Sequence, residues 1–250
     1  MANDAEQGYP PFDMPKPVAE NLWIVDARPI RAFGIPLPVR MTVVRLASGD
    51  LWLHSPTRFA PALLQELERL GPIRHLIAPN IGHWTFLADW QRNCPDATTW
   101  AAPNLRRRPR IRLSSIRTDR DLGKRPPPDW QHDLDQRIIA GAGFQEVAFL
   151  HRESRSLILT DLVMNLEPDR MPARSRLYAA LSGTTAPEGG TPRYLRLPLR
   201  LGRRKAVEAA TALIDWQPDR VIFAHGRWFA NDGAAKLRKA FRWLVGPSGE

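Results

Sequence analysis

The sequence predicts an α/β protein with an αββα sandwich architecture, in which two mixed β-sheets pack face to face and helices cover their outer faces. Two observations predict this class. The two halves of the chain repeat one series of elements: a strand or hairpin, then a helix, a strand and a helix. Each half also combines short apolar runs, typical of buried strands, with longer runs whose apolar residues recur at helical spacing. Because helices cover only one face of each sheet, the two remaining faces are expected to pack against each other.

The first half combines an expected hairpin with an expected amphipathic helix. The hairpin has its turn at Gly49, between two apolar runs. The helix carries four leucines on one stripe and ends at Gly71 and Pro72. In chain order, the expected elements are a strand at 22–25, a hairpin at 41–54, a helix at 59–70, a strand at 73–78, a helical segment at about 84–93 and a strand at 97–102.

Residues 103–135 are rich in Pro, Arg and Asp and are predicted to form an excursion outside the core. Pro109 is expected to interrupt any helix there. We expect an exposed electropositive strip beside a pocket, made by Arg106, Arg107, Arg108, Arg110 and Arg112.

The second half begins near the glycine-containing segment 140–143 and continues with a hairpin whose turn lies at 152–155. The strands of this hairpin are expected at 145–150 and 156–160. The remaining expected elements are a helix near 172–181, a Gly/Pro-rich loop, a helix at 203–216, a strand at 220–224 and a closing helix at 233–244.

Composition and length are those of a single globular domain over residues 1–250, with 43% hydrophobic and 25% charged residues. Residues 1–17 lack the pattern of a secretory signal and are expected to form an N-terminal extension. The single cysteine, Cys94, fits a reducing compartment, so a cytoplasmic location is expected. No window approaches the roughly 20 apolar residues that a bilayer requires, so no membrane partner is expected.

The formal net charge of +10 favours anionic partners, and a small anionic ligand is the one expected here. The arginine-rich strip lacks the interleaved aromatic residues that stack on bases, so nucleic acid is not expected as a physiological partner. Oligomeric state, substrate and pathway do not follow from these patterns.

Polar residues follow four of the expected strands, at the positions where functional groups from distant segments commonly meet. The segments are HSPT at 54–57, LIAPNIGHWTFLADW at 76–90, LILTDLVMN at 157–165 and RVIFAHGRW at 220–228. In this order and spacing, over about residues 20–245, the chain resembles the metallo-β-lactamase superfamily. The phrases LWLHSPT, APNIGHW and HRESRSLILTDLV, with the late His-Gly, resemble a bacterial family of unknown function with a degenerate metal-binding loop.

The resemblance implies that one of the superfamily's two metal sites is lost. The superfamily loop has the form Thr-His-x-His-x-Asp-His. Here it places Ala78 at the threonine, and Pro79 and Ile81 at the first two histidines. His83 then falls at the aspartate and Trp84 at the last histidine. Proline and isoleucine cannot coordinate a metal.

The second site retains a smaller set, which the resemblance places at His83, Asp161 and His225. Two imidazoles and a carboxylate suit one divalent ion, zinc or iron. We therefore expect either a mononuclear metal-dependent hydrolase of a small anionic ester, thioester or phosphate, or a non-catalytic descendant of the fold that binds a ligand or partner. In the second case the histidines and Asp161 only satisfy each other by hydrogen bonds.

Supporting or pocket-lining positions are expected at His54, Asn80, Trp84 and Trp228. His54 occupies a strand end at which the superfamily usually has an aspartate behind the metal loop, and a plain strand-end hydrogen bond is the alternative. The remaining candidates are expected to have structural roles only. His151 is expected to cap the hairpin turn, His75 and His132 to lie at the surface, and Cys94 to pack as a small apolar residue.

Overall fold

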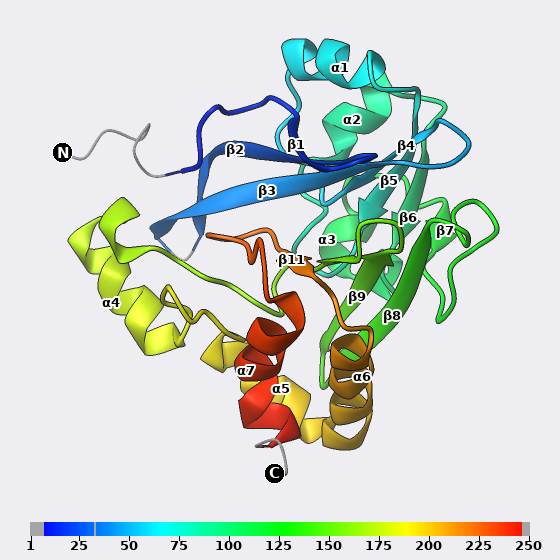
Figure 1. Cartoon of the computed structure of the whole chain (residues 1–250). Helices are drawn as coiled ribbons and strands as arrows, with labels where there is room; N and C mark the ends of the chain where they lie inside the picture. The colour runs from blue at the N-terminus through cyan, green and yellow to red at the C-terminus, as the bar shows by residue number, and fades with distance from the viewer. Residues whose placement is uncertain (1–7, 33, 247–250) are drawn as a thin grey trace.

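A computed structural model of the chain describes residues 8–32 and 34–246. The first sheet has seven strands in chain order, so that neighbours in sequence are neighbours in the sheet (Figure 1). Pairing is antiparallel from β1 to β4 and parallel from β4 to β7. The strands are β1 (Lys16–Ala19), β2 (Leu22–Ala32), β3 (Ile35–Arg45), β4 (Leu51–His54), β5 (Ile73–Ala78), β6 (Thr98–Ala101) and β7 (Arg120–Asp121).

The second sheet has the order β11-β10-β9-β8. Its strands are β8 (Leu134–Gly141), β9 (Phe144–His151), β10 (Ser156–Ile158) and β11 (Arg220–Ile222). The β9–β10 hairpin is antiparallel, with Ser156 opposite His151 as expected from a turn at 152–155. The parallel pairing of β10 with β11 brings the ends of these two strands to the same edge of the sheet.

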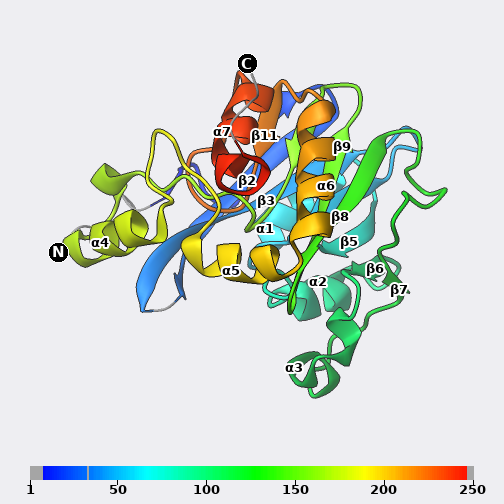
Figure 2. The same cartoon turned by 90° about the horizontal axis from the view of Figure 1, so that it is seen from below.

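Helices cover the outer face of each sheet, as Figures 1 and 2 show. The helices α1 (Pro61–Glu68) and α2 (Leu87–Asn93) pack on the first sheet, and α5 (Arg193–Leu201), α6 (Arg203–Asp215) and α7 (Gly233–Val245) pack on the second. The other helices among the described residues are α3 (Pro109–Arg112), which has one turn, and α4 (Ala173–Ser182), with 3-10 turns at Leu105–Arg107 and Pro168–Arg170.

Three apolar clusters fill the three spaces between the four layers. One lies between α1, α2 and the first sheet, and another between the second sheet and α5, α6 and α7. The middle cluster joins the inner faces of the two sheets and includes Trp52, Trp100, Trp130 and Phe149. A sheet buried on both faces needs apolar residues at consecutive positions, and β4 is buried throughout. The predicted αββα sandwich is therefore confirmed.

Two strands of the first sheet, β2 and β3, are longer than predicted. The expected strand at 22–25 extends from Leu22 to Ala32, and the strand expected to begin at Met41 begins at Ile35. Pro29, Pro36 and Pro38 argue against strand from sequence, because proline cannot donate to a sheet ladder. The pairing register shifts between Ala27 and Ile30, where Pro29 and Pro38 lie, whereas Pro36 lies in regular register opposite Arg31.

The predicted excursion at 103–135 is corrected by the structure. Leu105, Ile111, Leu122 and Trp130 are buried, and the segment contains β7 and the beginning of β8. Pro109 begins the helix α3 instead of interrupting one, because proline fits the first helical position.

The structure also differs from two further predictions, for the loop before residue 203 and for the N-terminal extension. The Gly/Pro-rich loop predicted before residue 203 contains α5, which tolerates Pro198 in its interior. Part of the predicted N-terminal extension joins the first sheet as β1, while residues 1–7 lie outside the described residues. No helix among the described residues is long and apolar enough to cross a bilayer.

Candidate metal centre

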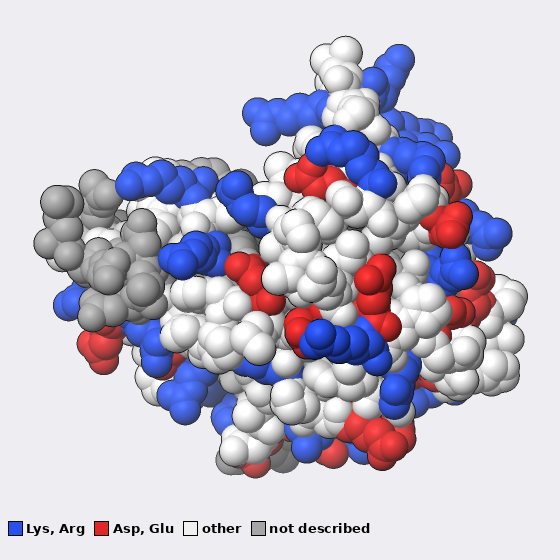
Figure 3. Space-filling view, turned by 90° about the horizontal axis from the view of Figure 1, so that it is seen from above, with Lys and Arg blue, Asp and Glu red and all other residues white. Residues whose placement is uncertain are grey.

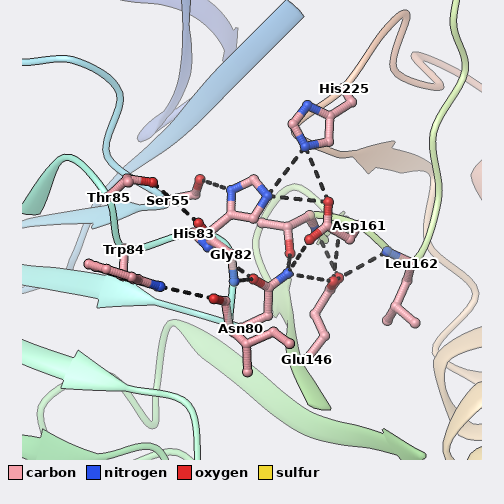
Figure 4. A network of polar contacts seen from close by, with 12 residues as sticks. Ser55, Asn80, Gly82, His83, Trp84, Thr85, Glu146, Asp161, Leu162 and His225 are labelled. Atoms are coloured by element: carbon pink, nitrogen blue, oxygen red, sulfur yellow. Dashed lines mark hydrogen bonds and ion pairs between the residues drawn. The ribbon is translucent and has the colours of Figure 1, made fainter. Parts of the chain in front are cut away.

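Three side chains from distant parts of the chain converge where strands of both sheets end (Figure 4). His83 lies in the loop after β5, Asp161 in the loop after β10, and His225 in the loop after β11. The Oδ1 atom of Asp161 is 3.3 Å from Nε2 of His83 and 3.2 Å from Nε2 of His225. The two Nε2 atoms are 3.3 Å apart. The three atoms form a nearly equilateral triangle, and we call these residues the His–Asp–His cluster.

The outer ring nitrogens orient both imidazoles. Nδ1 of His225 lies 2.8 Å from the carbonyl oxygen of Pro38, which can only accept, so this nitrogen carries the proton. This tautomer leaves the lone pair of Nε2 facing the cluster. Nδ1 of His83 lies 2.5 Å from the Ser55 hydroxyl, which can accept or donate. With Nδ1–H donating to Ser55, Nε2 of His83 presents a lone pair as well.

Asn80 connects the His83 loop to Asp161. Its Oδ1 accepts from the backbone N–H groups of Gly82 at 2.7 Å and His83 at 3.0 Å. Its amide nitrogen donates to Oδ2 of Asp161 at 2.7 Å and to Oγ1 of Thr160 at 2.8 Å. The orientation of the amide is thus fixed by acceptors on one side and donors on the other. Asn80 holds the second carboxylate oxygen of Asp161, so that Oδ1 faces the histidines.

Glu146 is a fully buried carboxylate in β9 that holds the Asp161 loop from behind. Its oxygens accept from the backbone N–H groups of Thr160 and Asp161, each at 2.8 Å, and of Leu162 at 3.2 Å. The Asn80 amide adds a contact at 3.2 Å. Sequence reasoning missed this residue, although a lone acid in the apolar strand Phe144–His151 is the signal of a buried, hydrogen-bonded charge.

Arg40 and Gly226 fix the loop that carries His225. Nη1 of Arg40 donates to the carbonyl oxygens of Phe223 at 3.0 Å and Gly226 at 2.8 Å, while Nη2 pairs with buried Asp26 at 2.7 Å. Gly226 has a φ of +91°, and a Cβ atom there would lie 2.1 Å from the carbonyl oxygen of Asn165. The glycine after His225 is therefore required by the backbone. Sequence reasoning missed Arg40, a charge within the apolar strand β3, and likewise Ser55.

The charges of the His–Asp–His cluster shift the pKa values of its members. Burial would raise the pKa of Asp161, but the adjacent His83 and His225 hold it well below its usual range. Burial would lower the pKa of His83, but the Asp161 carboxylate outweighs burial and raises it. Burial and the Asp161 charge raise the pKa of Glu146, against the opposing effect of its hydrogen bonds. Asp161 is thus an anion poised to neutralise a positive charge between the imidazoles.

The triangle has the dimensions of one face of a zinc coordination sphere. Zinc bonds to nitrogen of about 2.0–2.1 Å place tetrahedral ligands about 3.3–3.4 Å apart. Octahedral ligands at the same bond lengths would be about 2.8–3.0 Å apart. The observed separations of 3.2–3.3 Å match the tetrahedral value. The residues therefore fit one tetrahedral ion with three protein ligands and one open position.

The His–Asp–His cluster lies in a cavity of about 280 Å³, which we call the inner cavity. Its walls are mainly apolar and come from the β2–β3 hairpin, the 81–86 loop, β9 and α5. Asp161 is the single acid among the described residues that line it. Trp84, predicted as a pocket residue, is part of the wall, and its indole N–H donates to the Ile81 carbonyl at 2.9 Å.

Other predicted residues lie elsewhere. The buried ring of His54 stacks on Trp52 with centroids 5.4 Å apart, and no hydrogen bond joins it to the His–Asp–His cluster among the described residues. Burial lowers the pKa of His54 well below its usual value, so the ring is neutral. Trp228 packs on two apolar clusters and is not among the described residues lining the inner cavity.

The remaining histidines and Cys94 are not part of the His–Asp–His cluster. His75 was predicted at the surface, but it is buried and accepts from the Trp100 indole at 3.2 Å. A strand in the interior of the sheet leaves neither of its faces to solvent, which explains the error. His132 is exposed as expected, and His151 contacts the Ser154 hydroxyl at 2.8 Å in its turn. Burial raises the pKa of the Cys94 thiol to about 11, so the thiol is protonated.

Comparison with known proteins gives a family and a fold. Residues 19–183 match the model of a family described as "Domain of unknown function (DUF4336)". No curated protein matches the chain. The structure is similar to a metallo-β-lactamase from Pontibacter korlensis, with a TM-score of 0.59, 12% identity, and coverage of 93% of this chain and 99% of that one.

Two further solved structures show the same likeness. A metallo-β-lactamase from Hirschia baltica has a TM-score of 0.60 and 15% identity, with 94% and 98% of the two chains covered. The mono-zinc form of the metallo-β-lactamase FIM-1 from Pseudomonas aeruginosa has a TM-score of 0.61 and 15% identity, with 94% and 96% covered. At these identities the likeness shows the fold, and it confirms the predicted resemblance.

Proposed function

The chain belongs to the DUF4336 family, whose description assigns no activity, and we propose that it is a mononuclear metal-dependent hydrolase. The metal, zinc by preference, would be held by Nε2 of His83, Oδ1 of Asp161 and Nε2 of His225. The substrate would be a small anionic ester, thioester or phosphate.

The observation that carries this proposal is the triangle of ligand atoms with sides of 3.2–3.3 Å. Two imidazoles that only needed partners for their polar atoms could satisfy them in many arrangements. Here the Nδ1 atoms of both histidines are hydrogen-bonded, His225 to the Pro38 carbonyl and His83 to the Ser55 hydroxyl. Both Nε2 atoms therefore face one point. This arrangement is typical of metal-ligating histidines, whose second ring nitrogen bonds to an oxygen acceptor.

A bound zinc ion would supply a Lewis acid and lower the pKa of a water ligand to about 7. The residues of the chain would position the metal ligands and exclude bulk water. Asn80 and Glu146 fix Asp161, and Arg40 fixes the His225 loop, so the ligands need little rearrangement. The apolar walls of the inner cavity exclude bulk water and suit the uncharged part of a substrate.

Hydrolysis of the anionic ester mono-p-nitrophenyl succinate, a succinyl thioester and p-nitrophenyl phosphate tests the proposal. Each is measured with the purified chain, after metal removal, and after reloading with zinc or iron. We expect turnover of at least one substrate that is lost on metal removal and restored by one of the metals. Metal binding without turnover of any substrate would favour the non-catalytic alternative, and turnover that survives metal removal would contradict the proposed chemistry.

A further inference from the structure

A second cavity adjoins the His–Asp–His cluster on the far side of its loop. This outer cavity has a volume of about 630 Å³ and is lined by Ile81, Gly82, Trp84, Thr85, Arg108, Pro109 and Arg110. The first four of these residues also line the inner cavity. The loop that carries His83 is therefore a common wall of both cavities, and groups bound in the two cavities would both contact it.

The outer cavity is cationic. Arg108 and Arg110 line it, and no acid is found among the described residues of its wall. Figure 2 shows α3 projecting from the body of the molecule, and in the opposite view of Figure 3 basic side chains gather around this projection. The arginines of the segment differ in their partners. Arg106 is paired with Asp121 at 2.9 Å, whereas no described acid pairs with Arg108 or Arg110.

Arg108 is held in place without losing its charge. Its Nη2 donates to the carbonyl oxygen of Gly143 at 2.9 Å, a neutral acceptor in the β8–β9 turn. One of the five N–H donors of the guanidinium is thus used for anchoring, and the others are free for an oxyanion. Trp84 and Ile81 add apolar surface to the same cavity. The indole of Trp84 is fixed by its hydrogen bond to the Ile81 carbonyl, and 36% of the Ile81 surface is exposed.

From this juxtaposition we propose that the outer cavity is an anion subsite, in which Arg108 and Arg110 bind a phosphate or carboxylate group of the substrate. Arginines that line one cavity can bind such oxyanions through charge-assisted hydrogen bonds. The substrate class is then an ester or thioester with an oxyanion at one end and its scissile bond in the inner cavity. This reading rests on the proposed function for the scissile bond, but the anion site itself does not depend on the metal.

The test is calorimetric titration of the full-length chain with inorganic phosphate and, separately, with succinate at low salt. The double variant Arg108→Ser/Arg110→Ser removes the two cavity arginines. The matched control Arg107→Ser/Arg112→Ser removes two exposed arginines of the same segment that do not line the cavity. The net charge changes equally in both, so long-range attraction is the same. The better-binding anion identifies the group as phosphate or carboxylate.

We expect the double variant Arg108→Ser/Arg110→Ser to bind the better-binding anion about tenfold or more weakly than the wild type. The control variant should lose less than about twofold in affinity. Equal weakening in both variants would show a general charge effect and overturn the subsite, as would no change in either. Repeating the titration with Asp161→Ala separates the two proposals. Binding that persists there and still depends on Arg108 and Arg110 supports the subsite whatever the metal content, and binding lost with Asp161 overturns it.

Discussion

Asp161 is the only carboxylate in the His–Asp–His cluster, and both imidazoles meet the same oxygen of it, at 3.2 and 3.3 Å. Its other oxygen is engaged by Asn80 at 2.7 Å, which prevents the carboxylate from rotating away. The negative charge needed beside a divalent cation is therefore concentrated at one atom. No other acid that the structure describes joins the cluster as a fourth potential ligand.

Substituting Asp161→Ala is expected to abolish metal binding, because it removes the only carboxylate of the cluster. His151→Ala is the control: His151 is buried at the end of β9, beside the β9–β10 turn and away from the cluster, and metal content should be unchanged. Elemental analysis of the three purified proteins makes the comparison. Equal loss in both variants would show that the metal is not held where we place it.

Zinc affinity should depend on pH through His83. A metal displaces the proton from an imidazole, and Asp161 raises the pKa of His83 above its ordinary value of about 6.5. Protonation therefore competes with zinc as the pH falls through this raised value, and affinity should drop by about tenfold per pH unit below it. Asp161, whose pKa is held low, stays ionised throughout. Competition titrations with a chromophoric chelator between pH 5.5 and 8.5 measure this, and a flat profile would contradict it.

At the scale of elements, the cluster is assembled by strands that hold one another's loops. Glu146 of β9 accepts three consecutive backbone N–H groups just after β10, and Pro38 and Arg40 of β3 bind the segment after β11. The second of these links runs between the two sheets. The ligand positions are thus coupled to the packing of the sandwich rather than to any single loop.

Replacing Glu146→Gln should destabilise the fold and weaken the site. One carboxylate oxygen becomes an NH₂ group facing N–H donors, which leaves a buried donor unpaired and lowers the free energy of unfolding by about 1–3 kcal/mol. Zinc affinity should fall by about 10- to 100-fold, as for other groups that support ligands. The control Glu153→Gln changes an exposed acid and should stay within about 0.5 kcal/mol. Urea unfolding and zinc titration compare them. Equal stability of the two variants would refute the role of Glu146.

The sequence predicts the elements whose signals are local. Buried strands such as β5 and amphipathic helices such as α6 follow from apolar runs and periodicity, and polar residues at strand ends indicate the region of the site. Glu146, Arg40 and Ser55 escape prediction because their partners lie far along the chain. Arg40, for example, binds Gly226, 186 residues away. The burial of His75 escapes for the same reason, since its partner Trp100 lies in the next strand.

At the scale of the whole molecule, the chain has the αββα sandwich fold, and the His–Asp–His cluster lies where strands of both sheets end. Among the described residues the His–Asp–His cluster is the single group of three potential ligands close enough to hold an ion, and the side chains of Pro79 and Ile81 offer no ligand atoms. The inner cavity provides an apolar compartment beside it, and the outer cavity provides a cationic one. One metal per chain is therefore the central claim.

The most direct test is the zinc stoichiometry of the native protein. The metal-depleted chain is titrated with zinc and examined by native mass spectrometry, with His83→Ala and His225→Ala variants measured in parallel. One zinc ion per wild-type chain is expected, with binding lost in both variants. No zinc bound, two ions bound, or one ion that persists when either histidine is removed would contradict the account.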